Sequence, residues 1–261
     1  MRTRNTLLSA KDSALIEQVI LHHGQIVNSA QLEQVFKEAY STKGDTLRRI
    51  SLLAKAGWLV RIKRGLYLVV ADLSALAIGN TSHFLISNAL NSQSYISFAS
   101  ALNYHGMFDQ LIKTVDAITY KTARNYRFQN MEFRFFRTKK ELYFGFTKER
   151  VEGKLVNIAE KEKIILDYLY LRKNTAALSL IVEKLKEYKS DFNFSKMVDY
   201  AKTYNLATIR NLGFLFDTIG VSSDGLYELA DKNMRGFSKM HAQAKTFNAK
   251  WRLYYDPRII E

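Results

Sequence analysis

Hydrophobic positions in the first seventy residues follow helical patterns first and extended patterns afterwards. Residues 11–22 carry apolar side chains at i, i+1, i+4 and i+5, which predicts an amphipathic helix that ends at Gly24. A short extended segment at 26–29 leads to Ser29, which we expect to cap a second helix. A third helix follows and ends near Ala56. The pattern therefore predicts three short helices, with a small strand between the first two.

The third helix and the segment after it carry the clearest pattern. Leu47, Ile50 and Ala54 are expected to mark the buried side of this helix. Two β-rich runs then occupy residues 58–70 and flank a Lys-Arg-Gly tripeptide at 63–65. Such runs around a short glycine-containing turn predict a tight β-hairpin with a basic tip.

Three short helices, a small strand and a basic-tipped hairpin are typical of a winged helix-turn-helix. In that fold an α-helix fills the major groove of DNA, and the hairpin beside it reaches the backbone or the minor groove. The alternative is a solvated basic face on an ordinary helical subdomain. The candidate DNA-binding residues lie on the outward face and at the start of the third helix, and on the hairpin: Thr42, Lys43, Thr46, Arg48, Arg49, Arg61, Lys63 and Arg64.

Beyond residue 70 the pattern changes twice. Residues 74–91 have a helical pattern, and they are followed by a short strand in SYISF and a short helix at 98–106. Residues 113–150 alternate with period two and are rich in aromatic and β-branched side chains, which predicts strands of an antiparallel or mixed sheet, including one in the run LYFGF. From residue 156 onward the pattern is helical again.

We therefore expect an α+β protein. Its N-terminal winged helix-turn-helix domain spans residues 1–72. A larger mixed domain, with an aromatic-rich β-sheet and C-terminal helices, spans residues 73–261.

Charge favours a nucleic-acid partner. The chain has 39 lysines and arginines against 25 aspartates and glutamates, a formal net charge of +14. Its isoelectric point is about 9.7, and values above about 9 suit a nucleic-acid binder. Residues 1–70 hold 11 of the basic residues and only 5 of the acidic ones, so they are about twice as basic per residue as the rest.

Two later segments are also basic and aromatic. In residues 113–150 arginines and lysines interleave with aromatic residues. This pattern is either a stacking surface for a single-stranded nucleic acid or, more commonly, a buried aromatic face with a solvated basic face. The last stretch, 232–261, contains Trp251, Tyr254 and Tyr255 and packs against a partner, a nucleic acid or the body of the protein.

Several classes of protein are excluded or disfavoured. Without cysteine the chain has no disulfide scaffold, cysteine-ligated metal or thiol catalysis. No apolar run approaches the roughly 20 residues of a membrane span, and the N-terminus lacks a signal peptide, so we expect a cytoplasmic bacterial protein. Phosphate-binding loops, zinc-binding histidine pairs and hydrolase nucleophile motifs are missing. We therefore expect no enzyme, no catalytic residues, no cofactor and no bound metal.

Weak chemical signals have ordinary interpretations. Asp116 with Glu132 and Arg134 faintly resembles the Asp and Glu-x-Lys pattern of a nuclease that binds Mg²⁺. Arginine stands in place of the lysine, so a metal-dependent nuclease is a less favoured alternative. The acidic residues between 160 and 167 are interpreted as a charged helix face. His105 is interpreted as a packed or capping histidine at a helix end.

Four motifs occur in a specific order: LLAKAGWLVRIKRGLYLV, SYISFASALNYHGM, VNIAEKEKIILDYLYL and LGFLFDTIG. Together they resemble AbiEi-type antitoxins of type IV toxin–antitoxin, abortive-infection systems, over roughly residues 10–220. The matching positions are Gly57, Arg64, Gly65 and Tyr67 in the first motif, Ser100, Ala101, Leu102, His105 and Gly106 in the second, and Glu162, Lys163 and Asp167 in the third. In the third motif Lys161 replaces the family's proline and Ile164 its alanine.

The resemblance implies an N-terminal domain that represses its own operon and a C-terminal domain needed for antitoxin activity in phage defence. It implies a nucleotidyltransferase-like toxin as functional partner, opposed without a stable complex. Because a helix-turn-helix reads a short half-site, we expect operator repeats in double-stranded DNA. We place the antitoxin activity in residues 71–261. The alternative is a winged-helix transcription factor whose C-terminal domain senses a ligand or dimerises.

Overall fold

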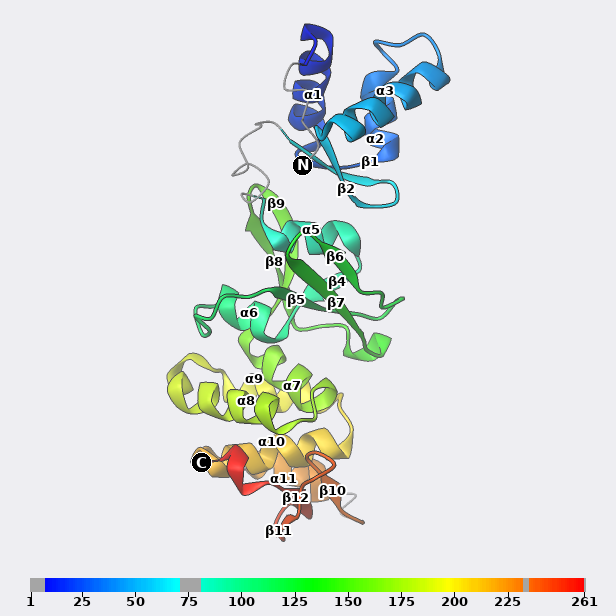
Figure 1. Ribbon diagram of the computed structural model, residues 1–261. Helices are drawn as coiled ribbons and strands as arrows, with labels where there is room; N and C mark the ends of the chain where they lie inside the picture. Colours follow the sequence, from blue (N-terminus) through cyan, green and yellow to red (C-terminus); the bar gives the residue numbers. More distant parts are fainter. Residues whose placement is uncertain (1–7, 71–80, 232–234, 261) are drawn as a thin grey trace. The chain divides into compact units, whose positions relative to one another are not determined.

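The computed structural model describes residues 8–70, 81–231 and 235–260 (Figure 1). Helices and β-sheets both contribute to the described residues, so the expected α+β class is confirmed. The chain divides into two compact units. The first unit comprises Met1–Ser92 and Val151–Lys154, and the second comprises Gln93–Arg150 and Leu155–Glu261. The predicted domain boundary at 72/73 lies outside the described residues.

The first unit contains the three helices and the hairpin that the sequence predicts. Its strands form one antiparallel sheet in the order β1-β3-β2. A cluster of buried apolar side chains from all three helices and from the sheet makes the core, with Val19, Phe36, Leu53 and Trp58 among its members. The elements are α1 (Ala10–His23), β1 (Ile26–Asn28), α2 (Ser29–Phe36), α3 (Lys43–Ala56), β2 (Leu59–Lys63), β3 (Leu66–Val69) and α5 (His83–Leu90).

The start of α2 differs by one residue from the prediction. The cap is Asn28 rather than Ser29. The Asn28 side chain accepts a hydrogen bond from the Gln31 amide at 2.9 Å, and the Gln31 side chain accepts one from the Asn28 amide at 2.8 Å. This reciprocal capping box satisfies two amides, which a serine one position later would not do.

The second unit is built on a six-stranded mixed sheet in the order β6-β7-β5-β4-β9-β8. Strands β5 and β7 pair in parallel, as do β4 and β9, whereas β4–β5 and β6–β7 are antiparallel. The strands are β4 (Ser94–Ile96), β5 (Thr114–Thr119), β6 (Tyr126–Phe128), β7 (Met131–Arg137), β8 (Phe146–Val151) and β9 (Lys154–Ala159).

Two predictions for this sheet are wrong. The run LYFGF is not a strand, because a 3₁₀ turn at Lys140–Leu142 precedes a loop and β8 begins only at Phe146. Residues 157–159 belong to β9 rather than to a helix, since Ile158 pairs with Ile96 of β4 and is buried there. Short apolar runs fit a buried strand and a buried helix equally well, so periodicity alone did not separate them.

The rest of the second unit is largely helical, as expected. Its helices are α6 (Phe98–Tyr104), α7 (Lys161–Leu171), α8 (Thr175–Glu187), α9 (Phe194–Ala201), α10 (Leu206–Thr218) and α11 (Asp224–Asp231). His105 is the residue that ends α6, and its Nε2 lies 2.8 Å from the carbonyl oxygen of Ala159. This placement agrees with the interpretation of His105 as a packed, capping histidine.

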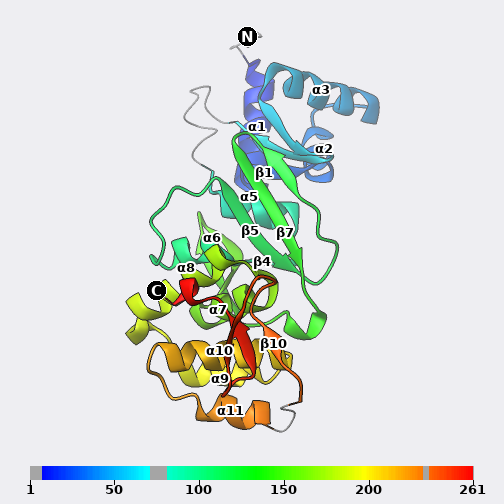
Figure 2. The same ribbon diagram turned by 60° about the horizontal axis from the view of Figure 1, so that its bottom comes forward.

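The C-terminal stretch forms a small sheet that packs on α10. Its strands are β10 (Ser238–Lys239), β11 (Thr246–Asn248) and β12 (Leu253–Tyr255), in the order β10-β12-β11. Figures 1 and 2 both show these strands beside α10. Trp251 is fully buried and its indole nitrogen donates a hydrogen bond to Asp217 at 2.7 Å. Of the three interpretations of this stretch, packing against the protein body therefore holds for Trp251.

Candidate nucleic-acid interface

The start of α3 is fixed by a cap that uses Thr42. The Thr42 hydroxyl oxygen accepts a hydrogen bond from the Asp45 amide at 3.1 Å, and the hydroxyl donates one to the Asp45 carboxylate at 2.6 Å. A threonine at this position satisfies an otherwise unpaired amide in the first turn. Thr42 therefore positions α3, and its hydroxyl is committed to the helix itself.

The buried face of α3 is rotated by about one residue from the prediction. Thr46, Ile50 and Leu53 are buried, and Thr46 is only 2% exposed. Leu47 is 45% exposed. The predicted core position of Leu47 is therefore wrong, whereas Ile50 is buried as predicted and Ala54 packs, partly buried, against the core. Thr46, predicted to reach DNA bases, instead donates a hydrogen bond to the Thr42 carbonyl at 3.1 Å.

The outward face of α3 is consequently a different set of side chains. Lys43, Leu47, Ser51 and Lys55 are all exposed and follow one another at intervals of four residues. Arg48 is exposed next to this stripe. Residues at i and i+4 share one side of a helix, so these five side chains form a single surface. We call these five residues the α3 face.

Arg49 faces the interior instead of the solvent. Its guanidinium group makes two hydrogen bonds to the carboxylate of Asp12 on α1, one of them from Nε to Oδ1 at 2.6 Å. Asp12 is fully buried and also accepts a hydrogen bond from Ser9. A buried carboxylate needs a paired cation. Arg49 therefore joins α3 to α1, which contradicts the outward placement that the helical wheel gave it.

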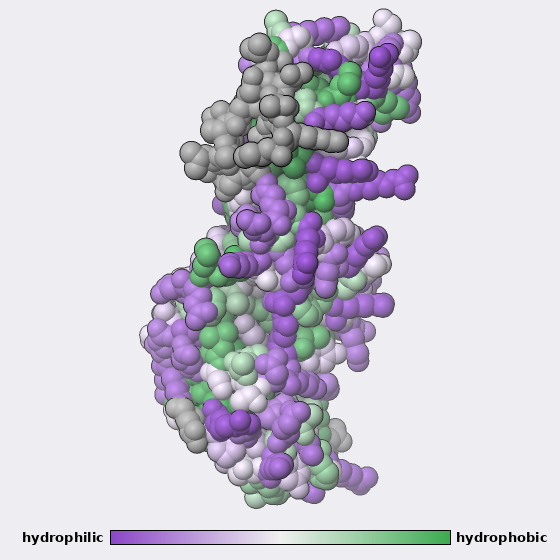
Figure 3. Space-filling model, viewed as in Figure 1, coloured by the Kyte–Doolittle hydropathy of each residue, from purple (hydrophilic) through white to green (hydrophobic). Residues whose placement is uncertain are grey.

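The β2–β3 hairpin is a tight turn. Lys63 pairs with Leu66, so Arg64 and Gly65 alone form the turn, and Gly65 adopts a φ of 76°. That left-handed conformation costs a glycine little, which explains the glycine here. Arg61 and Arg64 are exposed on this hairpin. Figure 3 shows hydrophilic side chains projecting at its end.

Lys63 is the exception among the hairpin cations. Its ammonium group donates a hydrogen bond to the carbonyl oxygen of Leu90, at the end of α5, at 2.8 Å. Partial burial lowers the pKa of Lys63. Lys63 therefore ties the hairpin to α5, and Arg61 and Arg64 carry the outward charge.

A groove of about 530 Å³ runs between α3 and the hairpin. Leu47, Ser51 and Lys55 line it from α3, and Arg61 lines it from β2. Glu33 of α2 also lines it and lies 3.8 Å from the ammonium group of Lys43. The groove thus combines cations from two elements, an exposed leucine and one carboxylate that partly offsets them.

Sequence reasoning missed Leu47, Ser51 and Lys55 and retained Thr46 and Arg49. The two sets differ in the rotational phase assigned to α3, that is, in which side of the helix is taken to face the core. Leu53 and Trp58 are both buried in the core of this unit. A wheel anchored on Leu53 rather than on Ala54 would have turned Thr46 and Arg49 inward. The buried partner of Arg49, Asp12, lies 37 residues away, and no local pattern points to it.

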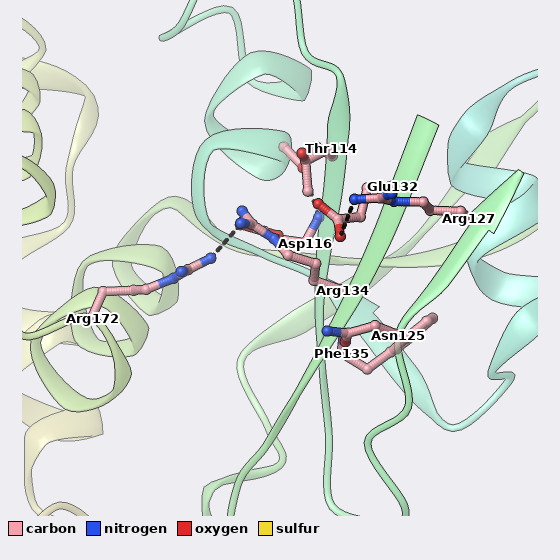
Figure 4. Close-up of polar contacts among 9 residues, drawn as sticks. Thr114, Asp116, Asn125, Arg127, Glu132, Arg134, Phe135 and Arg172 are labelled. Atoms are coloured by element: carbon pink, nitrogen blue, oxygen red, sulfur yellow. Dashed lines mark hydrogen bonds and ion pairs between the residues drawn. The ribbon is translucent and has the colours of Figure 1, made fainter. Parts of the chain in front are cut away.

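The weak nuclease pattern in the second unit is an ion-pair network (Figure 4). Asp116 accepts hydrogen bonds from Arg134 at 2.7 and 2.9 Å and from Arg172 at 2.6 Å. Glu132 instead lies 3.9 Å from Arg127. Two guanidinium groups occupy the carboxylate that would have to bind Mg²⁺. Within the described residues no three histidine, aspartate or glutamate side chains are grouped so as to hold a metal ion.

The acidic residues of α7 lie in a buried cluster, in which Lys163 and Asp167 form an i, i+4 ion pair. Glu162 and Asp167 are buried, and the fully buried Lys163 contacts the Asp167 carboxylate. The Lys163 ammonium group also donates to the hydroxyls of Tyr95 at 2.9 Å and Tyr204 at 2.7 Å. Burial lowers the pKa of Lys163 and raises that of Asp167, and their mutual contact opposes both shifts. This cluster joins α7 to Tyr95 of strand β4 and to Tyr204, which follows helix α9.

Comparisons with known proteins give a fold and no family. No family model matches the chain, and no curated protein matches it. Among solved structures it is similar to the crystal structure of the RV2827C protein from Mycobacterium tuberculosis. The TM-score is 0.65, the sequence identity is 12%, and the match covers 96% of this chain and 92% of that chain. At this identity the two chains share a fold, and nothing further follows. No helix in the described ranges has the length and apolar character to span a membrane.

Proposed function

We propose that residues 8–70 form a winged helix-turn-helix that binds double-stranded DNA, with α3 in the major groove and the β2–β3 hairpin against the backbone or minor groove. The observation that carries this proposal is the convergence of exposed cations from α3 and from the hairpin around one groove. A helix fits the major groove, and cations beside it neutralise phosphates.

The positions of the side chains suggest a division of roles. Arg48 is the α3 residue with a fork of donors suited to guanine, and Leu47 supplies an apolar contact for a thymine methyl group. Arg61 and Arg64 neutralise phosphates beside the hairpin. Thr42, Thr46, Arg49 and Lys63, all predicted DNA-binding residues, serve instead to build and hold the surface.

The biological role that fits this activity is repression of its own operon by an antitoxin of a type IV toxin–antitoxin system. The ordered AbiEi-like motifs support this role, and so does the presence of a large second unit beyond the DNA-binding one. The functional partner would be a nucleotidyltransferase-like toxin that the protein opposes without a stable complex. A transcription factor with a sensing or dimerising second unit is the competing role.

DNA binding is tested by fluorescence anisotropy with the DNA upstream of the gene and with a shuffled duplex. We expect tighter binding to the upstream DNA, and a slope of log affinity against log salt of about −0.9 for each phosphate neutralised. Arg48→Ala should lower affinity for the upstream DNA selectively, and Arg64→Ala should weaken both duplexes alike. Equal, weak binding of both duplexes by the wild-type protein would refute sequence-specific recognition.

The antitoxin role is tested in cells that express the neighbouring toxin gene from an unrelated promoter. The full-length protein carrying Arg48→Ala and Arg64→Ala cannot repress, so growth rescue by this variant would show direct neutralisation. If the folded variant does not rescue growth, we would assign the antitoxin effect to repression of the operon. A neighbouring gene unrelated to nucleotidyltransferases would favour the transcription-factor role.

A further inference from the structure

The small C-terminal sheet has two faces of opposite kind. Its inner face packs on α10, where Leu253 is buried and the ring of Tyr255 lies 4.6 Å, centroid to centroid, from that of Phe214. Because side chains alternate along a strand, Tyr254 points to the other face. On that outer face Tyr254 is half-buried.

Aromatic rings from β11, from β12 and from the residue before β10 meet on the outer face of the sheet. Phe247 of β11 is the cross-strand partner of Tyr254 on β12, and their ring centroids are 5.0 Å apart. Phe237, just before β10, lies 5.2 Å from Tyr254 on the opposite side. We call Phe237, Tyr254 and Phe247 the aromatic strip. Phe237 is 62% exposed and Phe247 49% exposed.

The segment that carries the strip is basic. Residues 235–255 contain five lysines and arginines and no aspartate or glutamate. The ammonium group of Lys239 lies 5.6 Å from the centroid of the Tyr254 ring. Lys245 and Arg252 are exposed and stand two residues before Phe247 and Tyr254. Lys245 directly precedes β11, so alternation along the extended chain places it on the side of the strip, whereas Arg252 lies outside β12 with a φ of 47°.

Exposed rings in a basic segment without acidic residues fit one kind of ligand better than others. A protein core or an ordinary oligomer interface depends on apolar contact, and lysine is depleted at such interfaces. A single-stranded nucleic acid offers unstacked bases to the rings and phosphates to the cations. Double-stranded DNA keeps its bases stacked, so it cannot use the aromatic strip in the same way.

We propose that the outer face of the β10-β12-β11 sheet binds single-stranded nucleic acid, with bases stacked on the aromatic strip and phosphates on Lys239 and Lys245. This site is separate from the α3 face and uses no residue of the proposed DNA interface. The chain then has one surface for duplex DNA and a second for unpaired strands.

The test uses full-length protein and fluorescence anisotropy with 12-nucleotide oligouridylate and oligothymidylate, which separate RNA from DNA as the strand bound. The double substitution Phe237→Leu with Phe247→Leu keeps apolar area and removes the π-faces. We expect it to lower affinity for the oligonucleotide about 10- to 100-fold. The matched double Phe→Tyr variant should stay within about 3-fold of wild type, and duplex DNA binding should be unchanged in both.

Three controls keep the test decisive. Tyr104→Ala removes a partly exposed ring from α6 in the same unit and should not change oligonucleotide affinity. Thermal melting establishes that each variant is folded. Sedimentation of wild type and the Leu variant tests a second copy as occupant. Absence of oligonucleotide binding, undiminished binding by the Leu variant, or a change from dimer to monomer would each overturn the proposal.

Discussion

Two three-stranded sheets in the described part of the chain, β1-β3-β2 and β10-β12-β11, differ in where their hydrophobic residues point. In the β1-β3-β2 sheet, Val27, Leu59 and Val69 are buried in the core of the first unit, and exposed cations lie at the hairpin. In the β10-β12-β11 sheet, buried Leu253 and Trp251 face α10, while Phe237 and Phe247 remain exposed. Both segments are basic, yet only the second leaves rings in solvent.

The two proposed ligands follow from this difference and not from net charge, which the two segments share. Cations on a helix and on a neighbouring hairpin suit the regular phosphates and the major groove of a duplex. Cations beside exposed rings suit a strand whose bases are free to stack. Two questions follow. The first is whether the elements under each surface pack as described, and the second is whether each surface binds its own form of nucleic acid without the other.

The largest expected effect concerns the packing of the C-terminal sheet. A Cβ on Gly213 of α10 would lie 2.1 Å from the nearest atom of the buried Trp251 ring. Gly213→Ala should therefore destabilise the protein by about 3 kcal/mol, measured by urea unfolding. In α3, a Cβ on Gly44 meets only the Thr42 hydroxyl at 3.6 Å. Gly44→Ala should instead stabilise by about 0.5–1 kcal/mol, and equal effects of the two would contradict the tight indole packing.

The second effect concerns the buried ion pair of the first unit. Asp12→Asn removes the carboxylate that accepts hydrogen bonds from Arg49 and Ser9. We expect the free energy of unfolding to fall by about 2 kcal/mol. Asp199→Asn removes the partner of Lys202 in an exposed pair and should cost less than about 0.5 kcal/mol. Similar costs at the two sites would show that Asp12 does not hold α1 to α3.

A smaller effect should appear in DNA binding. Glu33 lines the groove between α3 and the hairpin, where its charge opposes phosphate. Glu33→Gln should raise affinity for duplex DNA about 3-fold at low salt, with the gain disappearing at high salt. Glu228→Gln makes the same charge change on α11 in the second unit and should leave duplex affinity unchanged. An equal gain from both would point to net charge rather than to this groove.

The smallest effect is a pH dependence at the base of the C-terminal sheet. Burial would raise the pKa of Asp217, but hydrogen bonds from Lys250, Ser223 and Trp251 hold it below its usual value. A depressed pKa contributes stability above the unfolded value near 4, and this contribution is lost as pH falls through the folded value. The difference in melting temperature between wild type and Asp217→Asn should therefore shrink as pH falls from 5 to 3. If the difference in melting temperature does not change with pH, packing rather than the charge of Asp217 provides the stabilisation.

Local patterns in the sequence were enough to predict most elements of the first unit. The helical period gave α1, α2 and α3, and the Lys-Arg-Gly tripeptide gave the hairpin turn at Arg64 and Gly65. The phase of α3 was predicted wrongly, because the helical wheel was anchored on Ala54 rather than on Leu53. Thr46 is polar yet buried, and Leu47 is apolar yet exposed, so hydropathy placed each on the wrong side.

The functional surfaces depended on contacts that are distant in sequence. Arg48 and Arg49 are chemically identical neighbours, and only the presence of Asp12 on α1 distinguishes them. The polar residues of α7 resemble a solvated face, although Lys163 and Asp167 satisfy each other inside the second unit. The aromatic character of the C-terminal stretch was visible in the sequence. Its division into a buried Trp251 and an exposed Phe247 required the packing on α10.

The most direct test of duplex recognition by α3 compares these two neighbouring arginines. Arg48→Ala and Arg49→Ala are each measured for affinity to the upstream DNA and for free energy of unfolding. We expect Arg48→Ala to lose about 10- to 100-fold in affinity with unchanged stability. Arg49→Ala should lose about 2 kcal/mol of stability and, while folded, stay within about 3-fold of wild-type affinity. A folded Arg49→Ala protein that loses DNA binding, beside an Arg48→Ala protein that keeps it, would contradict the placement of the α3 face on DNA.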